Sequence, residues 1–125
     1  MKKTIVRSSE MLEKYNVYRE EKGADYSEKF AFNLEEENIL HAGDYWVVIP
    51  NDFPYDKVFE KHDLLVPKRV FAYASDMTKE EFDELQQLKL DLDEDYDSIL
   101  ENLYETRSVH KHFHLQLCMW KREDV

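Results

Sequence analysis

The chain has little of several residue types that mark particular classes of protein. One cysteine, Cys118, among 125 residues excludes an internal disulfide, so we expect a reducing, cytoplasmic setting. The presence of only two glycines argues against a loop-rich scaffold. No apolar run approaches the ~20 residues that a membrane helix needs, and the first residues lead into no apolar signal core. We therefore expect a soluble, unprocessed protein that does not bind membranes.

Positive charge is also scarce. There are 17 Lys and Arg residues against 28 Asp and Glu residues, which gives a net charge of -11. This balance argues against a general affinity for nucleic acid, because that mode of binding needs clustered cations. A small anionic ligand remains compatible with it, since the groups within a few ångströms decide its binding. The length and the 42% of hydrophobic residues suit a single domain.

An amphipathic helix is expected near the N-terminus. Residues 8–22 carry apolar and aromatic side chains at helical spacing, with Ser8 or Ser9 as the N-cap and Gly23 at the end. This helix lies outside the pattern that follows, so it is predicted to be an accessory element. The predicted division is an N-terminal helical extension over residues 1–37 and a main domain over residues 38–125.

The main domain begins with a pattern typical of strands. Apolar and aromatic residues on either side of Gly43-Asp44 predict a hairpin, with a buried strand over residues 45–49. A further strand is expected to start at His62 and to close at Pro67.

A helix start follows at Thr78, which forms a capping box with Glu81 three residues later. Apolar residues at three- and four-residue steps continue from Phe82 to Leu103, and they predict one long helix that ends shortly after. The acidic run over residues 91–97 is interpreted as its solvated face, because it lacks the spacing and central glycine of a calcium loop.

Three of the five histidines stand at alternate positions in the stretch HKHFHLQLCMW, residues 110–120. Its composition predicts a strand, in which successive side chains point to opposite faces. His110, His112, His114 and Gln116 would then share one face, with neighbouring imidazoles ~7 Å apart. Groups at this spacing can address a single polyatomic ligand.

Three interpretations of this histidine row are open. The residues could be half-exposed strand positions without a chemical role. They could ligate a metal ion with His62 or His41, although same-face neighbours on a strand lie too far apart for all three to reach one ion. The third interpretation is nucleophilic catalysis at phosphorus, in which a neutral imidazole forms a phosphoramidate that water or another acceptor resolves. A second imidazole and a glutamine on the same face would then orient the nucleophile and bind the phosphoryl oxygens.

The histidine row and the segment before it resemble the histidine triad superfamily, whose signature is His-φ-His-φ-His-φ-φ, with φ apolar. The resemblance runs from about Asn38 to Trp120 and includes YWVVIPNDFPYDKVFEKHDLLVPKRV, which is similar to the family's strand, turn and strand. The expected fold is α+β, with a histidine-triad-like antiparallel sheet of about five strands, one long helix and the extra N-terminal helix. The family resemblance also implies a homodimer.

The signature can be placed in two registers. In one, the triad is His110, His112 and His114 with His112 as the nucleophile, but Lys111 then occupies an apolar position. In the other, it is His112, His114 and Gln116. That form resembles the branch containing galactose-1-phosphate uridylyltransferase and diadenosine tetraphosphate phosphorylase. We prefer the second register, with His114 as the nucleophile, because its interleaved positions are apolar. His112 remains the alternative.

The resemblance assigns further positions residue by residue. His62, just before LLVPKR, matches the family's fourth histidine, which assists the leaving group or orients the triad. Asn51 or Asp52 stands where the family contacts the ribose. The residues expected to contact phosphate, in a segment without the family's usual glycine, are Asn102, Arg107 and Ser108.

These features predict a nucleotide-phosphate hydrolase or nucleotidyl transferase that forms a covalent nucleotidyl-histidine intermediate. Its substrate would be a nucleotide or nucleotide conjugate, and the mechanism requires no cofactor and no metal. Two alternatives stay open. One is a non-catalytic nucleotide-binding module of the same fold, which the altered triad and the missing glycine support. The other is a protein with a His-ligated metal.

Overall fold

The computed structural model describes residues 5–124 and has an α+β fold built on one five-stranded antiparallel sheet. The strands are β1 (His41–Ala42), β2 (Trp46–Pro50), β3 (Phe59–Pro67), β4 (Ser98–Leu100) and β5 (Leu115–Trp120), in the sheet order β1-β2-β3-β5-β4. The helices are α1 (Ser9–Lys22), α2 (Tyr26–Lys29), the short 3-10 helix η1 (Ala74–Asp76) and α3 (Lys79–Asp91). The predicted fold class and the five-stranded antiparallel sheet are confirmed.

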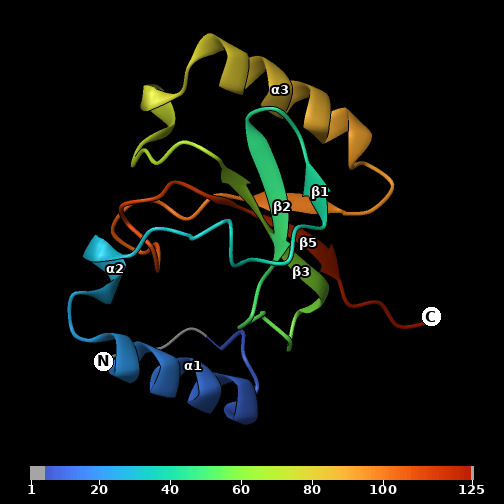
Figure 1. Cartoon of the computed structure of the whole chain (residues 1–125). Helices are drawn as coiled ribbons and strands as arrows, with labels where there is room; N and C mark the ends of the chain where they lie inside the picture. The colour runs from blue at the N-terminus through green and yellow to red at the C-terminus, as the bar shows by residue number, and fades with distance from the viewer. Residues whose placement is uncertain (1–4, 125) are drawn as a thin grey trace.

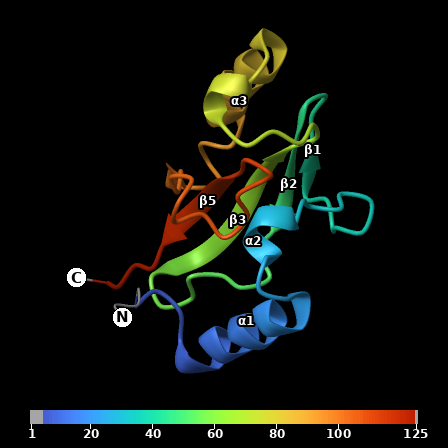
Figure 2. The same ribbon diagram turned by 90° about the vertical axis from the view of Figure 1, so that its left-hand side faces the viewer.

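Side chains alternate along the central strands and separate two apolar clusters, one on each face of the sheet. The larger cluster lies between the sheet and α3, and the smaller one contacts the chain that follows α2. Figure 1 and Figure 2 show α3 and α1 on opposite sides of the sheet. The larger cluster consists of Trp46, Val48, Leu65, Phe71, Leu85, Leu88, Leu92, Phe113, Leu115 and Leu117. The smaller cluster consists of Val47, Ile49, Leu64 and Val66, with Phe32 and Leu34 packed against it.

The sequence signals for the helix ends are confirmed. Ser8 Oγ accepts a hydrogen bond from the Met11 N–H at the start of α1 (3.2 Å). Gly23 follows α1 with a φ of 100°, a backbone conformation that favours glycine. Thr78 and Glu81 form the predicted capping box at the start of α3.

The prediction of one long helix reaching past residue 100 is wrong, because α3 ends at Asp91 and β4 follows it. Five acidic residues between positions 91 and 97 place negative charge at the helix C-terminus, where that charge opposes the helix dipole. The chain then joins the sheet, because the Asp97 N–H donates to the carbonyl oxygen of Cys118 in β5 (2.8 Å). A local acidic run and a tertiary hydrogen bond together end the helix.

The strand predicted over residues 110–120 is shorter than expected. Strand β5 begins at Leu115, so His110 and His112 precede it and do not line one continuous strand face. The His110 N–H instead donates to the carbonyl oxygen of Ser27 in α2 (2.6 Å). The backbone of His110 therefore hydrogen-bonds to the N-terminal segment and not to a strand of the sheet.

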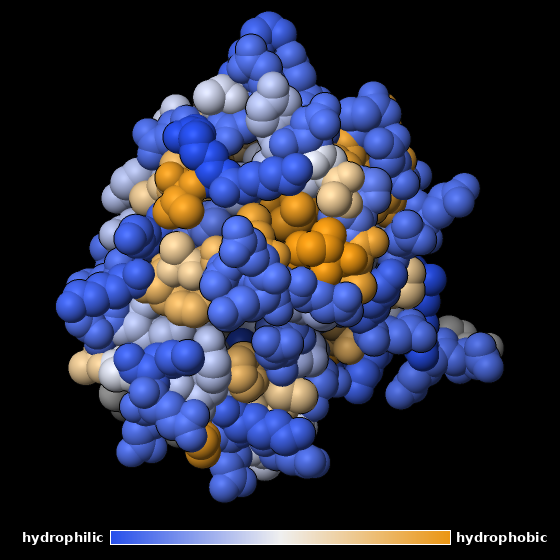
Figure 3. All heavy atoms as spheres, viewed as in Figure 1, coloured by the Kyte–Doolittle hydropathy of each residue, from blue (hydrophilic) through white to orange (hydrophobic). Residues whose placement is uncertain are grey.

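Hydrophilic residues cover most of the face seen in Figure 1, and apolar residues occupy smaller areas near its middle (Figure 3). Leu103, which the single-helix prediction placed in the apolar stripe, is 73% exposed. Within residues 5–124, no helix has the length and apolar character needed to cross a membrane.

Candidate active site

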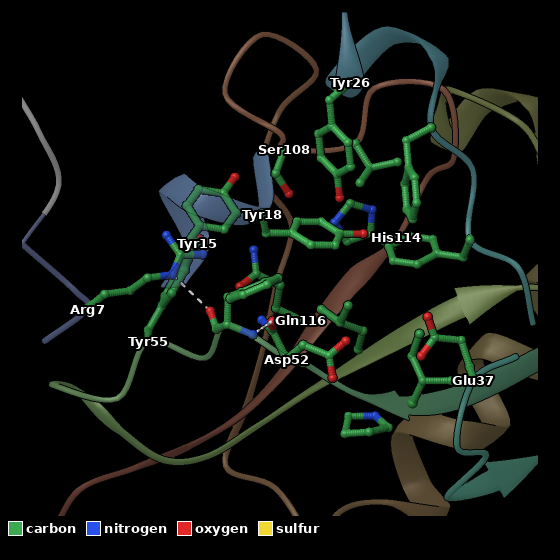
Figure 4. Close-up of a pocket in the computed structure, with 18 residues that line it drawn as sticks. Arg7, Tyr15, Tyr18, Tyr26, Glu37, Asp52, Tyr55, Ser108, His114 and Gln116 are labelled. Carbon is green, nitrogen blue, oxygen red and sulfur yellow. Dashed lines mark hydrogen bonds between the residues drawn. The ribbon is translucent and has the colours of Figure 1, made fainter. Parts of the chain in front are cut away.

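The candidate site lies on the face of the sheet that carries the N-terminal segment. Because side chains alternate along a strand, His62 and Leu64 of β3 share this face with Gln116 of β5, whose backbone pairs with Leu64. His114 precedes Gln116 by two residues, and both line one pocket together with Ile49 of β2 (Figure 4). The two-residue period of an extended chain thus directs His114 and Gln116 into the same pocket.

His62 does not line the pocket itself but hydrogen-bonds to Gln116, which does. Its Nδ1 accepts a hydrogen bond from the Tyr55 N–H (2.9 Å), so the ring proton lies on Nε2, which donates to Gln116 Oε1 (2.6 Å). Burial lowers the pKa of His62 to about 4; the bond to Gln116 opposes this shift, and the positive charge of Arg7 adds to it. The ring is therefore neutral at pH 7 and fixes the orientation of the Gln116 amide.

His114 has one ring nitrogen held and the other open. Its Nδ1–H donates to the His112 carbonyl oxygen (3.0 Å), whereas no residue in the described chain hydrogen-bonds to its Nε2. Burial lowers the pKa of His114 to about 4 against the effect of this hydrogen bond, and the charge of Arg107 lowers it further. At neutral pH, His114 is thus an uncharged imidazole with an available Nε2 lone pair.

His112 is fully buried, and both of its ring nitrogens are bonded. The Phe32 N–H donates to Nδ1 (3.2 Å), and Nε2–H donates to the Pro67 carbonyl oxygen (2.8 Å). Burial lowers the pKa of His112, and the hydrogen bond to Pro67 opposes that shift. The ring therefore joins the N-terminal segment to the end of β3, while the backbone carbonyl of His112 orients His114.

The structure does not bring His110 to the pocket. Its half-buried ring stacks on that of Tyr104, with the ring centroids 4.7 Å apart and the planes at 28°. A triad of His110, His112 and His114 would need His110 beside the other two rings and an open nitrogen on His112. Neither condition is met, so the geometry favours the register that contains Gln116.

Three of the five residues expected to contact the nucleotide line the pocket, namely Asn51, Asp52 and Ser108. Asn51 is held in place because its Oδ1 accepts a hydrogen bond from the Phe53 N–H (2.9 Å). Its amide nitrogen lies 3.4 and 3.3 Å from the two ring nitrogens of His62. The loop after β2 therefore reaches both the pocket and the histidine behind it.

Asn102 and Arg107, the other two, lie outside the pocket. Asn102 Nδ2 donates to the Tyr55 hydroxyl (3.4 Å). Arg107 is 3% exposed, and one of its terminal nitrogens donates to the carbonyl oxygens of Ala72 and His110. Its buried Nε has no hydrogen-bond partner in the described chain. The guanidinium thus connects two loops. The sequence predicted that Arg107 contacts phosphate, but this side chain does not line the pocket.

Sequence reasoning missed the wall that the N-terminal segment builds over the pocket. Tyr15 and Tyr18 stand one turn apart on α1, and the ring of Phe53 packs against both, with centroid distances of 5.4 and 4.9 Å. The available signal was this i, i+3 aromatic pair, which gives a helix a face that must pack on something. The lining residues from the segment are Arg7, Tyr15, Tyr18, Tyr26, Phe30, Phe32 and Glu37.

This wall closes most of the pocket. The open volume is about 70 Å³, whereas ligand pockets usually start at ~300 Å³. A nucleotide could enter only if the aromatic side chains of the N-terminal segment moved apart.

The charges around the pocket are unevenly placed. Among the described residues that line it, Arg7 is the only cation, and Glu37 and Asp52 are the acids. Burial raises the pKa of Glu37, and the negative charges of Asp52 and Glu36 raise it further. Figure 4 shows Arg7 on one side of the pocket and Glu37 on the other, so an anion is favoured on the Arg7 side.

No three His, Cys, Asp or Glu side chains are grouped to hold a metal ion anywhere in residues 5–124. His41, considered as a further ligand, is exposed on β1. The metal interpretation therefore has no ligand set in the described part of the chain.

The fold is similar to that of a solved structure, a histidine triad protein from Clostridium difficile. The TM-score is 0.51, the two sequences are 17% identical, and the match covers 71% of this chain and 83% of that one. No protein-family model and no curated protein matches the sequence. At this identity, the similarity establishes a histidine-triad-like fold.

Proposed function

We propose, from this histidine-triad-like fold and its pocket, that the chain is a nucleotide-phosphate hydrolase or nucleotidyl transferase with a covalent nucleotidyl-histidine intermediate. The observation that carries the proposal is the state of His114. Its Nδ1–H is held by a backbone carbonyl, and its neutral Nε2 has no hydrogen-bond partner among the described residues that line the pocket. Such a ring is oriented for attack and needs no prior deprotonation.

The first step joins the enzyme to the nucleotide. The Nε2 lone pair of His114 attacks the α-phosphorus, the Nε2–P bond forms, and the bond from phosphorus to the leaving group breaks with its electron pair on the leaving group. Nδ1 keeps its proton, so the ring becomes cationic, and the His112 carbonyl oxygen stabilises that charge. In the second step, water or an acceptor hydroxyl attacks phosphorus. The N–P electron pair returns to Nε2, and the proton of the attacking oxygen passes to solvent or to the departed group.

Gln116 is proposed to bind the oxygens around phosphorus. Because its Oε1 accepts the proton of His62 Nε2, its amide N–H groups remain as donors, and no described residue accepts from them. His62 then acts through Gln116 and not on the substrate, since it does not line the pocket. Ser108 is proposed to donate to a phosphoryl oxygen, and Asn51 and Asp52 to contact the ribose.

Steady-state turnover of adenosine phosphoramidate, a dinucleoside polyphosphate and a nucleotide sugar tests the proposal. His114→Ala should lower kcat/KM on the order of 10³-fold or more, because the nucleophile is removed. His110→Ala is the matched control and should stay near wild type, since that ring lies outside the pocket. Wild-type turnover by His114→Ala would contradict the proposal.

The non-catalytic binding module is retained as a second candidate because of the small open volume of the pocket, about 70 Å³. A binding module would bind AMP or a nucleotide sugar in calorimetry and turn over none of the three substrates. The enzyme proposal predicts both binding and turnover.

A further inference from the structure

Arg7 lies at one end of the pocket, and its side chain is held there by several contacts. Its Nε–H donates to the Phe53 carbonyl oxygen (2.9 Å). Its guanidinium carbon lies 4.2 Å from the ring centroid of Tyr15 and 4.8 Å from that of Tyr55. The next residue is fixed as well, because the Ser8 N–H and hydroxyl both donate to the Asp56 carboxylate (2.7 and 2.6 Å). The cation is thus held between two aromatic rings and cannot sample the surface freely.

The hydrogen-bonding capacity of Arg7 is mostly unused. A guanidinium has five N–H donors, and only Nε–H has an acceptor within residues 5–124. No carboxylate of the described chain forms an ion pair with Arg7, and the side chain is half-buried. A partly desolvated cation without a counter-charge is costly, and an anion at its terminal nitrogens would remove that cost.

The position of Arg7 relative to the reacting groups is specific. The Tyr55 ring lies beside the guanidinium and also contacts the ring of His62, with centroids 4.6 Å apart. His62 in turn bonds Gln116 (2.6 Å). Figure 4 shows Arg7 and His114 toward opposite ends of the pocket, with Gln116 between them.

A displacement at phosphorus runs in line, with the attacking and departing atoms on opposite sides. With His114 as the attacking group, the leaving group departs toward Gln116 and the Arg7 end. The carboxylates that line the pocket, Glu37 and Asp52, would disfavour an anion near them. An anionic leaving group therefore has one cation in the described pocket to meet, and it lies on the departure side.

We propose that Arg7, supplied by the N-terminal segment, binds a phosphate group on the leaving side of the substrate. The inference rests on the proposed function and assigns a binding residue to those substrates in which the α-phosphate is linked to a further phosphate. As His114 Nε2 bonds to the α-phosphorus, the P–O bond to the bridging oxygen breaks. The departing phosphate keeps that oxygen and its electron pair, and Arg7 binds the resulting charge.

The test compares kcat/KM for ADP-glucose and for adenosine phosphoramidate in wild type, Arg7→Gln and Arg7→Lys. Arg7→Gln should lower kcat/KM for ADP-glucose roughly 10- to 100-fold, the loss expected for hydrogen bonds to a charged group. It should leave the phosphoramidate nearly unchanged, because the amino group of that substrate takes a proton from solvent as the P–N bond breaks and departs as uncharged ammonia. Arg7→Lys should recover part of the loss, since it restores the charge without the fork of donors.

Arg19→Gln is the matched control. Arg19 also lies over Tyr15, 5.7 Å from the ring centroid, but it does not line the pocket. Its removal should affect both substrates equally and slightly. An equal loss on both substrates in Arg7→Gln, or no loss on either, would overturn the role of Arg7.

Calorimetric titration with ADP and AMP keeps the inference testable if wild type turns over neither substrate, a result that would remove only the proposed catalysis. Wild type should bind ADP more tightly than AMP, and Arg7→Gln should abolish the difference while its melting temperature and AMP affinity stay near wild type. Equal affinities for ADP and AMP in wild type would refute the phosphate site at Arg7.

Discussion

Lowering the pH from 7 to 5 should destabilise the folded protein, because its buried histidines resist protonation. Burial lowers the pKa of both His62 and His114 to about 4, whereas an unfolded chain has a histidine pKa of ~6.5. The unfolded state then binds more protons, so the free energy of unfolding is at its full value above pH 6.5. It falls as the pH drops toward 4. Each ring should contribute a loss of ~2 kcal/mol between pH 7 and pH 5, or ~4 kcal/mol together.

Urea unfolding at several pH values, followed by the fluorescence of the fully buried Trp46, measures this loss. His62→Gln and His114→Asn each retain a hydrogen-bond donor, and each should reduce the pH-dependent loss by ~2 kcal/mol. The carboxylates with lowered pKa titrate mainly below this window. An unfolding free energy that stays constant from pH 7 to pH 5 would refute the burial of two neutral imidazoles.

Two further predictions concern the elements that frame the pocket. Asp56→Asn weakens the two hydrogen bonds from Ser8, so amide exchange in α1 should become faster by roughly 10-fold at equal global stability; unchanged exchange would mean that other contacts anchor the helix. Glu84 accepts hydrogen bonds from three successive N–H groups, those of Asp44, Tyr45 and Trp46 (2.8 Å each). Glu84→Ala should therefore lower the free energy of unfolding by ~2 kcal/mol in urea titration, with Glu84→Gln retaining about half, and a loss below ~0.5 kcal/mol would contradict this role.

Features with local causes could be predicted from the sequence. The caps at Ser8 and Thr78 use side chains within three residues of the N–H groups that they accept, and the hairpin forms between neighbouring strands. The period of two in strands β3 and β5 likewise brought His62 and Gln116 to the same face of the sheet. These elements follow from chemistry that a short window of residues contains.

The structure differs from the sequence predictions at side chains whose hydrogen-bond partners lie far away in the sequence. The role of His112 depends on Phe32, 80 positions away, and that of Arg107 on the carbonyl oxygen of Ala72. Both side chains have chemistry suited to a phosphate site, and both are instead used for packing and loop connection. Sequence spacing alone could not separate these outcomes.

The packing of the N-terminal segment over the pocket could not be predicted from the sequence pattern either. The N-terminal helix was predicted, but nothing in its spacing indicated which surface it would cover. The contacts of the N-terminal segment join Arg7 and Tyr15 to Phe53 and Tyr55, which lie roughly 40 to 50 positions further along the chain. The prediction of residues 1–37 as a separate extension stays a prediction, while the pocket takes seven of its lining residues from that segment.

The most direct measurement is intact mass followed by peptide mapping after rapid acid-free quenching of the protein with a nucleotide substrate. We predict a mass increase of one nucleotidyl group, mapped to His114, absent in His114→Ala and present in His112→Ala and His110→Ala. An adduct on His112 that survives the His114→Ala substitution, or turnover with no adduct at any time after mixing, would contradict His114 as the nucleophile.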